Sequence, residues 1–366
     1  MRIAIIHYWL VNMRGGEKVL QALCELFPGA DIFTHVHDPL ITEECFPGHK
    51  ILTTFIQKLP YARKNYQNYL LLMPMALKRL DLSGYDLVIS SESGPAKGVV
   101  TAPGALHICY CHTPMRYAWD MYDEYRSNAP WLKRVLMPPV MHYMRKWDVA
   151  SAAGVDQFVA NSHFVAGRIR KYYGRSAQVI YPPVAVDDFI ANERPEDFYL
   201  MVGQLTRYKR VDLAVEAFNQ SGRRLVIIGE GEQLQLLRQR VRENVQIMGR
   251  QPFPVIRDHY SRCRALIFPG VEDFGIVPVE AMASGRPVIA FGYGGATETI
   301  KENVTGLFFS EQTADSLNNA VTDFESRSNF DPLKIAEHAG QFEQNVFKER
   351  FKYLVEKLIT RRDKDA

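Results

Sequence analysis

The chain has 366 residues, of which 47% are apolar, so it can bury a core in each of two ordinary domains, and disorder over most of its length is excluded. Its 44 Lys and Arg side chains nearly balance 41 Asp and Glu side chains, which argues against nucleic-acid binding through bulk positive charge. Five cysteines, with one C-x-C pair, match neither a disulfide framework nor the ligand spacing of a zinc site.

The apolar run that opens the chain, Ile3–Val11, contains His7 and lacks the cleavage pattern of a signal peptide, so we expect a first buried strand there. No apolar run reaches the roughly 18 residues of a membrane-spanning helix. These features predict a cytoplasmic α/β protein.

Short apolar runs then alternate with helical segments. A Gly15-Gly16 turn and a helix over about residues 17–26 follow the first strand, and further strands are predicted at 86–90, 106–110, 157–160 and 178–181. Beyond Pro182-Pro183 the alternation of strands and helices begins again. Strands are predicted at 199–202, 224–228, 245–248, 265–268 and 288–290, and helices at 211–219 and 231–242. This alternation predicts two parallel sheets, a domain over residues 1–185 and a second over 190–345. Ligands of such sheets bind beyond the carboxyl ends of the strands, so two facing sheets predict an active site in the cleft between them.

Charge is distributed unevenly along the chain. Residues 1–180 carry 20 basic and 14 acidic side chains, whereas the rest carry 24 and 27. Two stretches of the basic half, 46–80 and 125–147, contain no Asp or Glu but mix cations with aromatic and aliphatic residues. The residues expected to face an acceptor or a membrane are Lys58, Arg63, Lys64, Lys78, Arg79, Trp131, Lys133 and Arg134. This composition is typical of an element in a membrane interface, but two core helices with solvated basic faces have the same composition.

Three glycine-containing loops follow predicted strands. Gly15-Gly16 at a helix start favours a phosphate site, although an ordinary tight turn has the same sequence. Gly229-Glu-Gly231 would begin a dinucleotide motif, but Leu234 replaces its third glycine, which weakens the case for a nicotinamide-dependent oxidoreductase. Gly203-Gln-Leu-Thr-Arg-Tyr-Lys-Arg210 places three cations where a diphosphate could bind, or forms a plain surface charge run.

The most specific pattern is Glu272-Asp-Phe-Gly-Ile-Val-Pro-Val-Glu280, followed by Gly285-Arg-Pro287 and Gly294-Gly-Ala-Thr-Glu298. This E-x7-E block resembles the donor-binding half of the retaining glycosyltransferases of family 4, which have the two-domain GT-B fold. In the first half, Cys109-Tyr-Cys-His-Thr-Pro114 and Val179-Ile-Tyr-Pro-Pro-Val184 resemble the mannosyltransferases of bacterial O-antigen and capsule assembly.

The resemblance implies site residues. It assigns catalysis to Glu272, His112 and Lys209, with Glu272 on the hexose and Lys209 on the leaving phosphate. Donor binding falls to Gly15, Gly16, Gly203, Arg207, Lys209, Gly249, Arg250, Glu272, Phe274, Gly275, Ile276, Val277 and Glu280. For Glu280, expected on the ribose, the alternative is a first-turn acid that complements the helix dipole; for His112 it is a purely structural histidine. Gln204 stands where the family usually has Arg, and we expect Arg207 to substitute for it.

The resemblance also implies the reaction and the partners. The expected activity is transfer of mannose from GDP-mannose to a polyprenyl-diphosphate-linked oligosaccharide, with retention and without metal, at the inner face of the cytoplasmic membrane. The one D-x-D, Asp363-Lys-Asp365, lies in the polar tail and cannot enclose a cation. A UDP-hexose donor, a non-catalytic nucleotide-sugar-binding module and a GT-B epimerase remain as alternatives. We expect the helix over about residues 347–366 to cross back to the first domain and act as part of the hinge.

Overall fold

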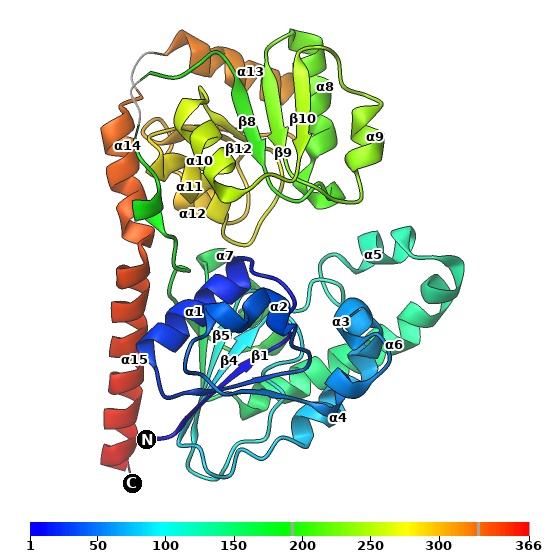
Figure 1. The fold of residues 1–366 in the computed structure, drawn as a ribbon, viewed down its shortest axis with the longest axis vertical. Helices are drawn as coiled ribbons and strands as arrows, with labels where there is room; N and C mark the ends of the chain where they lie inside the picture. Colours follow the sequence, from blue (N-terminus) through cyan, green and yellow to red (C-terminus); the bar gives the residue numbers. More distant parts are fainter. Residues whose placement is uncertain (192–193, 328–329, 366) are drawn as a thin grey trace. The chain divides into compact units, whose positions relative to one another are not determined.

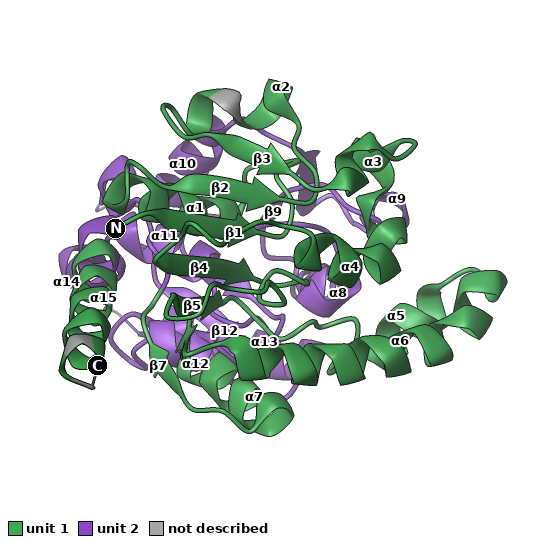
Figure 2. Cartoon of the chain, turned by 90° about the horizontal axis from the view of Figure 1, so that it is seen from below, with its two compact units in different colours: residues 1–181, 348–366 green, residues 182–347 purple. Residues whose placement is uncertain are grey.

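The computed structural model describes residues 1–191, 194–327 and 330–365, and the chain forms two compact units. Unit 1 comprises Met1–Tyr181 and Lys348–Ala366, and unit 2 comprises Pro182–Phe347 (Figure 2). Each unit contains one parallel sheet, so the prediction of two doubly wound domains is confirmed.

Unit 1 contains a seven-stranded sheet in the order β3-β2-β1-β4-β5-β6-β7. Its strands are β1 (Ile3–His7), β2 (Asp31–Thr34), β3 (Ile51–Thr53), β4 (Leu87–Glu92), β5 (Leu106–Cys111), β6 (Gln157–Ala160) and β7 (Ala177–Val179). All six residues of β4 and of β5 are buried, because these central strands are covered on both faces. Ile5 of β1 pairs with Ile32 on one side and Ile89 on the other, which fixes the centre of the sheet.

The helices of unit 1 connect these strands (Figure 1). They are α1 (Gly15–Leu26), α2 (Pro39–Thr42), α3 (Ala62–Asn65), α4 (Met73–Lys78), α5 (Tyr122–Asn128), α6 (Trp131–Ser151) and α7 (His163–Tyr173), with the carboxyl-terminal helix α15 (Gln344–Asp365) joining the unit from Lys348 onward.

Unit 2 contains a six-stranded sheet in the order β10-β9-β8-β11-β12-β13. The strands are β8 (Tyr199–Val202), β9 (Leu225–Ile228), β10 (Val245–Gly249), β11 (Leu266–Phe268), β12 (Val288–Phe291) and β13 (Gly306–Phe309). Its helices are α8 (Val211–Ser221), α9 (Leu234–Arg238), α10 (Phe253–Arg262), α11 (Ile276–Ala283), α12 (Ala296–Thr299), α13 (Ala314–Ser326) and α14 (Pro332–Ala339).

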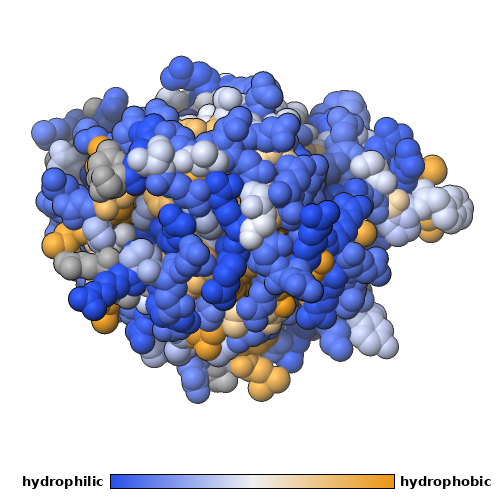
Figure 3. All heavy atoms as spheres, turned by 90° about the horizontal axis from the view of Figure 1, so that it is seen from above, coloured by the Kyte–Doolittle hydropathy of each residue, from blue (hydrophilic) through white to orange (hydrophobic). Residues whose placement is uncertain are grey.

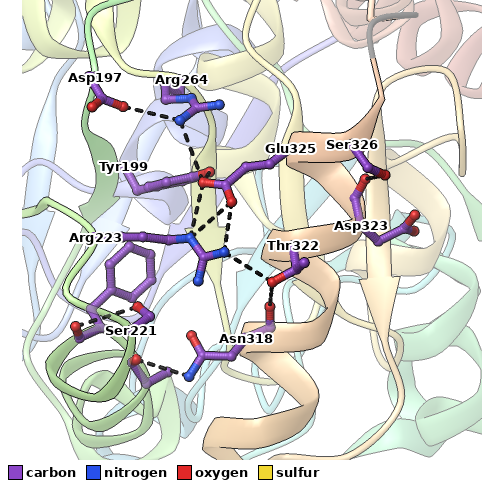
Figure 4. Close-up of polar contacts among 12 residues, drawn as sticks. Asp197, Tyr199, Ser221, Arg223, Arg264, Asn318, Thr322, Asp323, Glu325 and Ser326 are labelled. Carbon is purple, nitrogen blue, oxygen red and sulfur yellow. Dashed lines mark hydrogen bonds and ion pairs between the residues drawn. The ribbon is translucent and has the colours of Figure 1, made fainter.

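A polar cluster ties strand β8 and the segments just before β9 and β11 to helix α13 (Figure 4). Glu325 accepts hydrogen bonds from Tyr199 Oη at 2.9 Å and from Arg223 Nη2 at 2.7 Å. Arg264 lies 3.5 Å from the same carboxylate and 3.0 Å from Asp197. Burial raises the pKa of Glu325, but these hydrogen bonds outweigh it and lower the pKa below its ordinary value.

The sequence analysis missed three strands and overextended one helix. Strands β2, β3 and β13 have only three or four residues, and two of them include Asp or Thr, so apolar periodicity did not reveal them. The helix predicted over 231–242 is reduced to α9, Leu234–Arg238. Residues 231–233 form a turn before this helix, in which Gln233 N–H donates to the Leu205 carbonyl oxygen at 3.0 Å.

Helix α15 packs on unit 1 through its apolar face. Phe351 is fully buried, with its ring 6.4 Å from the rings of both Phe27 and Tyr110. Lys348 forms an ion pair with Glu25 at 2.8 Å, and Arg362 forms one with Asp156 at 3.2 Å. Within the described residues, no helix combines the length and the hydropathy that crossing a membrane requires.

Candidate active site

The topological switch point of unit 2 lies between β8 and β11. From this pair the chain continues to β9 and β10 on one side and to β12 and β13 on the other. Loops that leave such neighbouring strands diverge to opposite sides and leave space for a ligand. The loop after β8 carries Lys209 and the loop after β11 carries Glu272, so two predicted catalytic residues come to the same edge.

Lys209 and Glu272 form an ion pair, with Nζ 2.7 Å from Oε1. Their side chains are only 13% and 19% exposed, so water screens the pair incompletely. A cation and a carboxylate held together in a partly dry loop region can each recognise a different part of one ligand: an anionic phosphate and vicinal hydroxyl groups.

Glycines bring the backbones of these loops together. A Cβ at Gly270 would lie 2.7 Å from Lys209 Cα, so the loop after β11 contacts the loop after β8 directly. A Cβ at Gly295 would lie 2.4 Å from Phe274 Cα, and the Gly295 N–H donates to the Glu272 carbonyl at 2.8 Å. The second glycine of the G-G-x-x-E pattern therefore supports the Glu272 loop, a role that was not predicted from the sequence.

A second glycine cluster braces the loop after β8. Gly203 has φ of +144°, and a Cβ there would lie 2.9 Å from Lys209 Nζ. Gly229 follows β9 and approaches so closely that its Cβ would lie 1.8 Å from the Gly203 carbonyl oxygen. The Gly229-Glu-Gly231 run, which resembles part of a dinucleotide motif, thus packs two loops together. At the end of β10, the carbonyl oxygen of Gly249 accepts from Gly229 N–H at 2.9 Å, and exposed Arg250, the next residue, pairs with Glu230 at 3.5 Å; both were predicted as donor-binding residues.

Helix α11 begins just after Gly275, whose φ is +95°. Ile276 and Val277 are its first residues and are half-buried, which places their N–H groups in the first turn of a helix, where anions bind favourably. The Phe274 side chain is buried with its ring 5.5 Å from that of Phe342, so only the backbone of this residue can serve a ligand.

Glu280 lies beyond the first turn of α11. The alternative that it complements the helix dipole as a first-turn acid is therefore wrong. Its Oε2 accepts a hydrogen bond from Tyr260 Oη at 3.0 Å. Burial and then the Glu280 charge raise the pKa of Tyr260 far above its ordinary value, so the phenol stays a donor that orients the carboxylate.

Arg207 is exposed and opens the single 3-10 turn Arg207–Lys209, whereas Gln204 is half-buried. Arg210, the third cation of this loop, lies 3.4 Å from both Asp212 and Gln312. Arg207 is thus the exposed cation of the turn that contains Lys209.

The unit 1 candidates lie at the carboxyl edge of the other sheet. Gly15 and Gly16 are the first residues of α1. A Cβ at Gly16 would lie 2.3 Å from Tyr8 Oη and 3.7 Å from His112 Nε2, so the glycine allows close approach of two rings. His112 follows β5, is half-buried, and its Nε2 lies 2.8 Å from Ser91 Oγ. Ser91 was not among the predicted residues.

Both acid-free stretches belong to unit 1, and they touch. The predicted cations Lys58, Arg63, Lys64, Lys78, Arg79, Lys133 and Arg134 are all exposed. Lys133 Nζ on α6 lies 3.2 Å from Asn68 Oδ1, which joins the two stretches. Trp131 is 76% exposed, and Leu132, Val135 and Leu136 beside it are exposed as well. In the first stretch, Met73 is fully buried, so the apolar residues 70–73 do not form one exposed face. Hydrophilic side chains dominate the face drawn in Figure 3.

No group of three or more His, Cys, Asp or Glu in the described part of the chain is arranged to hold a metal ion. The side chains of Asp363 and Asp365 lie outside the described residues.

Comparisons with solved structures identify the class of protein. Anabaena HepE in complex with UDP matches with a TM-score of 0.72 at 16% identity, covering 98% of this chain and 100% of that chain. A sucrose-phosphate synthase from Thermosynechococcus elongatus matches with a TM-score of 0.75 at 18% identity and the same coverage. The two parallel-sheet units and these neighbours define the GT-B fold of glycosyltransferases.

Family models identify the family. Residues 13–188 match the model described as Glycosyltransferase Family 4, and residues 187–346 match Glycosyl transferases group 1. The chain belongs to glycosyltransferase family 4, and its curated relatives include mannosyltransferases.

Three of these relatives are named as mannosyltransferases. An alpha-1,3/1,6-mannosyltransferase of Rhizomucor pusillus is 26% identical over 65% of this chain and 62% of its own length. The O-antigen chain mannosyltransferase RfbU of Salmonella typhimurium is 29% identical over 35% and 40%. A GDP-mannose-dependent phosphatidylinositol monomannoside mannosyltransferase of Mycobacterium tuberculosis is 28% identical over 46% and 52%. Each match covers less than two thirds of the relative.

Proposed function

We propose that this chain is a retaining mannosyltransferase that moves mannose from GDP-mannose to a lipid-linked oligosaccharide during surface polysaccharide assembly. The observation that carries the proposal is the Lys209–Glu272 pair at the switch point of unit 2, 2.7 Å apart and partly buried. The names of the mannosyltransferase relatives support the sugar.

In this proposal the donor binds across the carboxyl edge of the unit 2 sheet. Glu272 accepts hydrogen bonds from the hexose hydroxyls, and Glu280, oriented by Tyr260, accepts them from the ribose. The first N–H groups of α11 and the Lys209 ammonium bind the diphosphate. Exposed Arg207 supplies the charge that Gln204 does not.

The chemical step needs no side-chain nucleophile. The acceptor hydroxyl oxygen bonds to the anomeric carbon as the bond from that carbon to the phosphate oxygen breaks on the same face. The electron pair of the broken bond leaves with GDP, and the acceptor proton passes to a diphosphate oxygen. Lys209 stabilises the negative charge that develops there, which is the work a metal ion performs in other transferases. We assign His112 to the transferred sugar, as the family resemblance implies.

The surface of unit 1 supports a membrane-held acceptor. The apolar group on α6 that begins with Trp131 is exposed beside Lys133 and Arg134. Lys133 also contacts Asn68 of the other stretch, whose predicted cations are exposed as well. Such a surface can bind anionic lipid and a polyprenyl diphosphate reversibly. The enzyme is therefore proposed to work at the inner face of the cytoplasmic membrane.

A thermal-shift panel of GDP, UDP and ADP sugars tests the donor. A ligand at 100 times its dissociation constant adds about 2.7 kcal/mol to stability, and GDP-mannose is expected to give the largest shift. The second candidate is a UDP-hexose donor, favoured by the UDP held in the HepE structure. A larger shift with a UDP sugar would replace GDP-mannose in the proposal.

Transfer of radiolabelled mannose to a polyprenyl-diphosphate-linked acceptor tests catalysis, with and without a chelator. Labelled lipid product with the α anomer is expected, at the same rate in both samples. Tight donor binding without any transfer would support a non-catalytic module. Free sugar released without acceptor would support an epimerase.

A further inference from the structure

Behind His112, which follows β5, a row of side chains runs through strands β4 and β1 to helix α1 of unit 1. His112 Nε2 lies 2.8 Å from Ser91 Oγ, and Ser91 Oγ lies 3.0 Å from His7 Nδ1. His7 Nε2 faces Glu17 Oε1 at 3.7 Å. Ser91 and the side chain of His7 are fully buried, and the Glu17 side chain is 2% exposed, so bulk water does not reach this chain.

Glu17 and His112, the two ends of this row of side chains, are each held by further contacts. Glu17 Oε2 accepts the backbone N–H of Arg14 at 3.0 Å, which fixes the carboxylate at the start of α1. His112 N–H donates to the Glu92 carbonyl oxygen at 2.8 Å, which fixes the backbone after β5. Tyr8 and Gly16 pack against the same ring, since a Cβ at Gly16 would lie 3.7 Å from His112 Nε2 and 2.3 Å from Tyr8 Oη.

The carboxylate sets the direction of the hydrogen bonds. At 3.7 Å the contact between Glu17 Oε1 and His7 Nε2 is longer than a hydrogen bond, but the carboxylate attracts an N–H dipole and repels a nitrogen lone pair. It therefore favours the His7 tautomer that carries its proton on Nε2 and leaves Nδ1 as an acceptor. Ser91 then donates to His7 Nδ1 and uses its oxygen to accept from His112. His112 must therefore carry a proton on Nε2.

The opposite direction is unfavourable in a buried site. If Ser91 donated to His112, it would accept from a protonated Nδ1 of His7. A neutral His7 would then place the bare Nε2 against the Glu17 carboxylate, which is repulsive, and a second proton would create a buried imidazolium.

We propose that Glu17, His7 and Ser91 are positioning residues that fix the ring of His112 in the tautomer protonated on Nε2. The consequence for transfer depends on the proposed function, which assigns His112 to the sugar, but the tautomer itself does not. A histidine held in one tautomer presents a defined donor and a defined acceptor, which is what selective contact with a neutral hydroxyl group requires.

Nitrogen-proton correlation spectra of the imidazole rings test the tautomer without substrate. The chain has ten histidines, and loss of one signal in His112→Gln assigns the ring. The parent is expected to show His112 protonated on Nε2. In Glu17→Gln the amide can donate to His7 Nε2 and reverse the chain, so the His112 signal is expected to move toward the Nδ1-protonated form.

Two further variants test whether the His112 signal depends on Glu17 and Ser91 specifically or changes with any substitution nearby. Glu25→Gln changes the same residue type on the same helix, where Glu25 pairs with Lys348 at 2.8 Å, and should leave the His112 signal unchanged. Ser91→Ala cuts the chain, so adding Glu17→Gln to it should move the signal no further. Ser91→Ala also keeps the test available if Glu17→Gln does not fold.

Activity gives a second reading. With transfer established, Glu17→Gln is expected to lower kcat by about tenfold or more and to leave the donor KM nearly unchanged, because the wrong tautomer presents the wrong group. A parent His112 protonated on Nδ1, or an unchanged His112 signal in Glu17→Gln, would overturn the inference. If the His112 signal shifts in Glu17→Gln as expected but the parent protein transfers no sugar, the inference is supported and the proposed function is contradicted.

Discussion

The carboxyl edges of the two sheets present different chemistry. In unit 2, Lys209 and Glu272 stand as an ion pair on loops whose backbones are pressed together by glycines. In unit 1, a single half-buried His112 is backed by a buried hydrogen-bonded chain. The difference suggests a division of labour: separable opposite charges suit a charged diphosphate sugar, and a fixed neutral ring suits a hydroxyl group.

The strongest test of this comparison removes the unit 2 pair. Lys209→Ala and Glu272→Gln are each expected to lower kcat by about 10²–10³-fold, the usual cost of losing one preorganised group that stabilises developing charge. The melting temperature should hardly change, because both side chains lie in loops and their removal opens no core cavity. Transfer assays and thermal melts on the same samples measure both quantities.

A matched control is Lys334→Ala, which breaks the exposed pair with Asp331 in the same unit. It should keep parental kcat. If Lys209→Ala transfers sugar at the parental rate, Lys209 does not stabilise the leaving phosphate and the contrast between the two edges loses its basis.

The next largest effect is expected at Gly295, which packs against the Glu272 loop of unit 2. Gly295→Ala should lower activity by about tenfold and stability by about 1–3 kcal/mol, because its Cβ would overlap the backbone of Phe274 and displace the Glu272 loop. Gly340→Ala is the control, since a Cβ there meets nothing within 4 Å. Full activity in Gly295→Ala would show that the position of the Glu272 loop does not limit catalysis.

Sequence reasoning could locate the loops of the site but not which loops meet. Lys209 and Glu272 were both expected after strands, and they follow β8 and β11. Their pairing depends on β9 and β10 lying on the other side of β8, and strand order is a tertiary property. The chain behind His112 was missed for the same reason: Ser91, His7 and Glu17 come from three separate elements, although His7 at a strand end and Glu17 after Gly16 were available signals.

The fold was easier to predict than its edges. Central strands such as β4 and β5 contain clear apolar segments, Leu87–Ile89 and Ile108–Cys111, because both faces of these strands are buried. The edge strand β3 has three residues, none of them buried, and pairs only with β2. Its strand conformation depends on that backbone pairing, which apolar pattern does not encode.

The Glu325 cluster lies outside the candidate site of unit 2 and allows a test of stability alone. Glu325→Gln is expected to destabilise unit 2 by about 1–3 kcal/mol near neutral pH, because it weakens hydrogen bonds to charged Arg223. Donor binding and kcat should stay parental, since the cluster supports the sheet and not the loops. Chemical denaturation at several pH values measures the free energy of unfolding.

The pH dependence of that difference follows from the lowered pKa of Glu325. A carboxyl group whose pKa is lower in the folded state stabilises the fold above its unfolded pKa, about 4.3, and loses this contribution as the pH falls through the folded pKa. The difference in free energy of unfolding between the parent and Glu325→Gln should therefore be largest near pH 7 and shrink below about pH 4. A gap that stays constant into acid would contradict the ion-pair explanation.

The smallest expected effects concern the surface of unit 1. Neutralising Lys133 and Arg134 with Gln should weaken binding to anionic vesicles by about 1 kcal/mol for each charge, and added salt should weaken the parent toward the variant. Trp131→Ala should instead lower the binding that survives high salt, since its side chain is 76% exposed and apolar. Flotation with anionic and neutral vesicles measures both parts.

Unit 2 provides the matched control for this surface. Lys301→Gln and Lys334→Gln remove two exposed cations from the other unit and should leave flotation unchanged, because the proposed membrane contact belongs to unit 1 alone. Equal loss in both variant pairs would mean that binding follows net charge and not a defined surface. If the parent floats with neither kind of vesicle, the two acid-free stretches are core helices with solvated faces, and a soluble acceptor replaces the lipid-linked one.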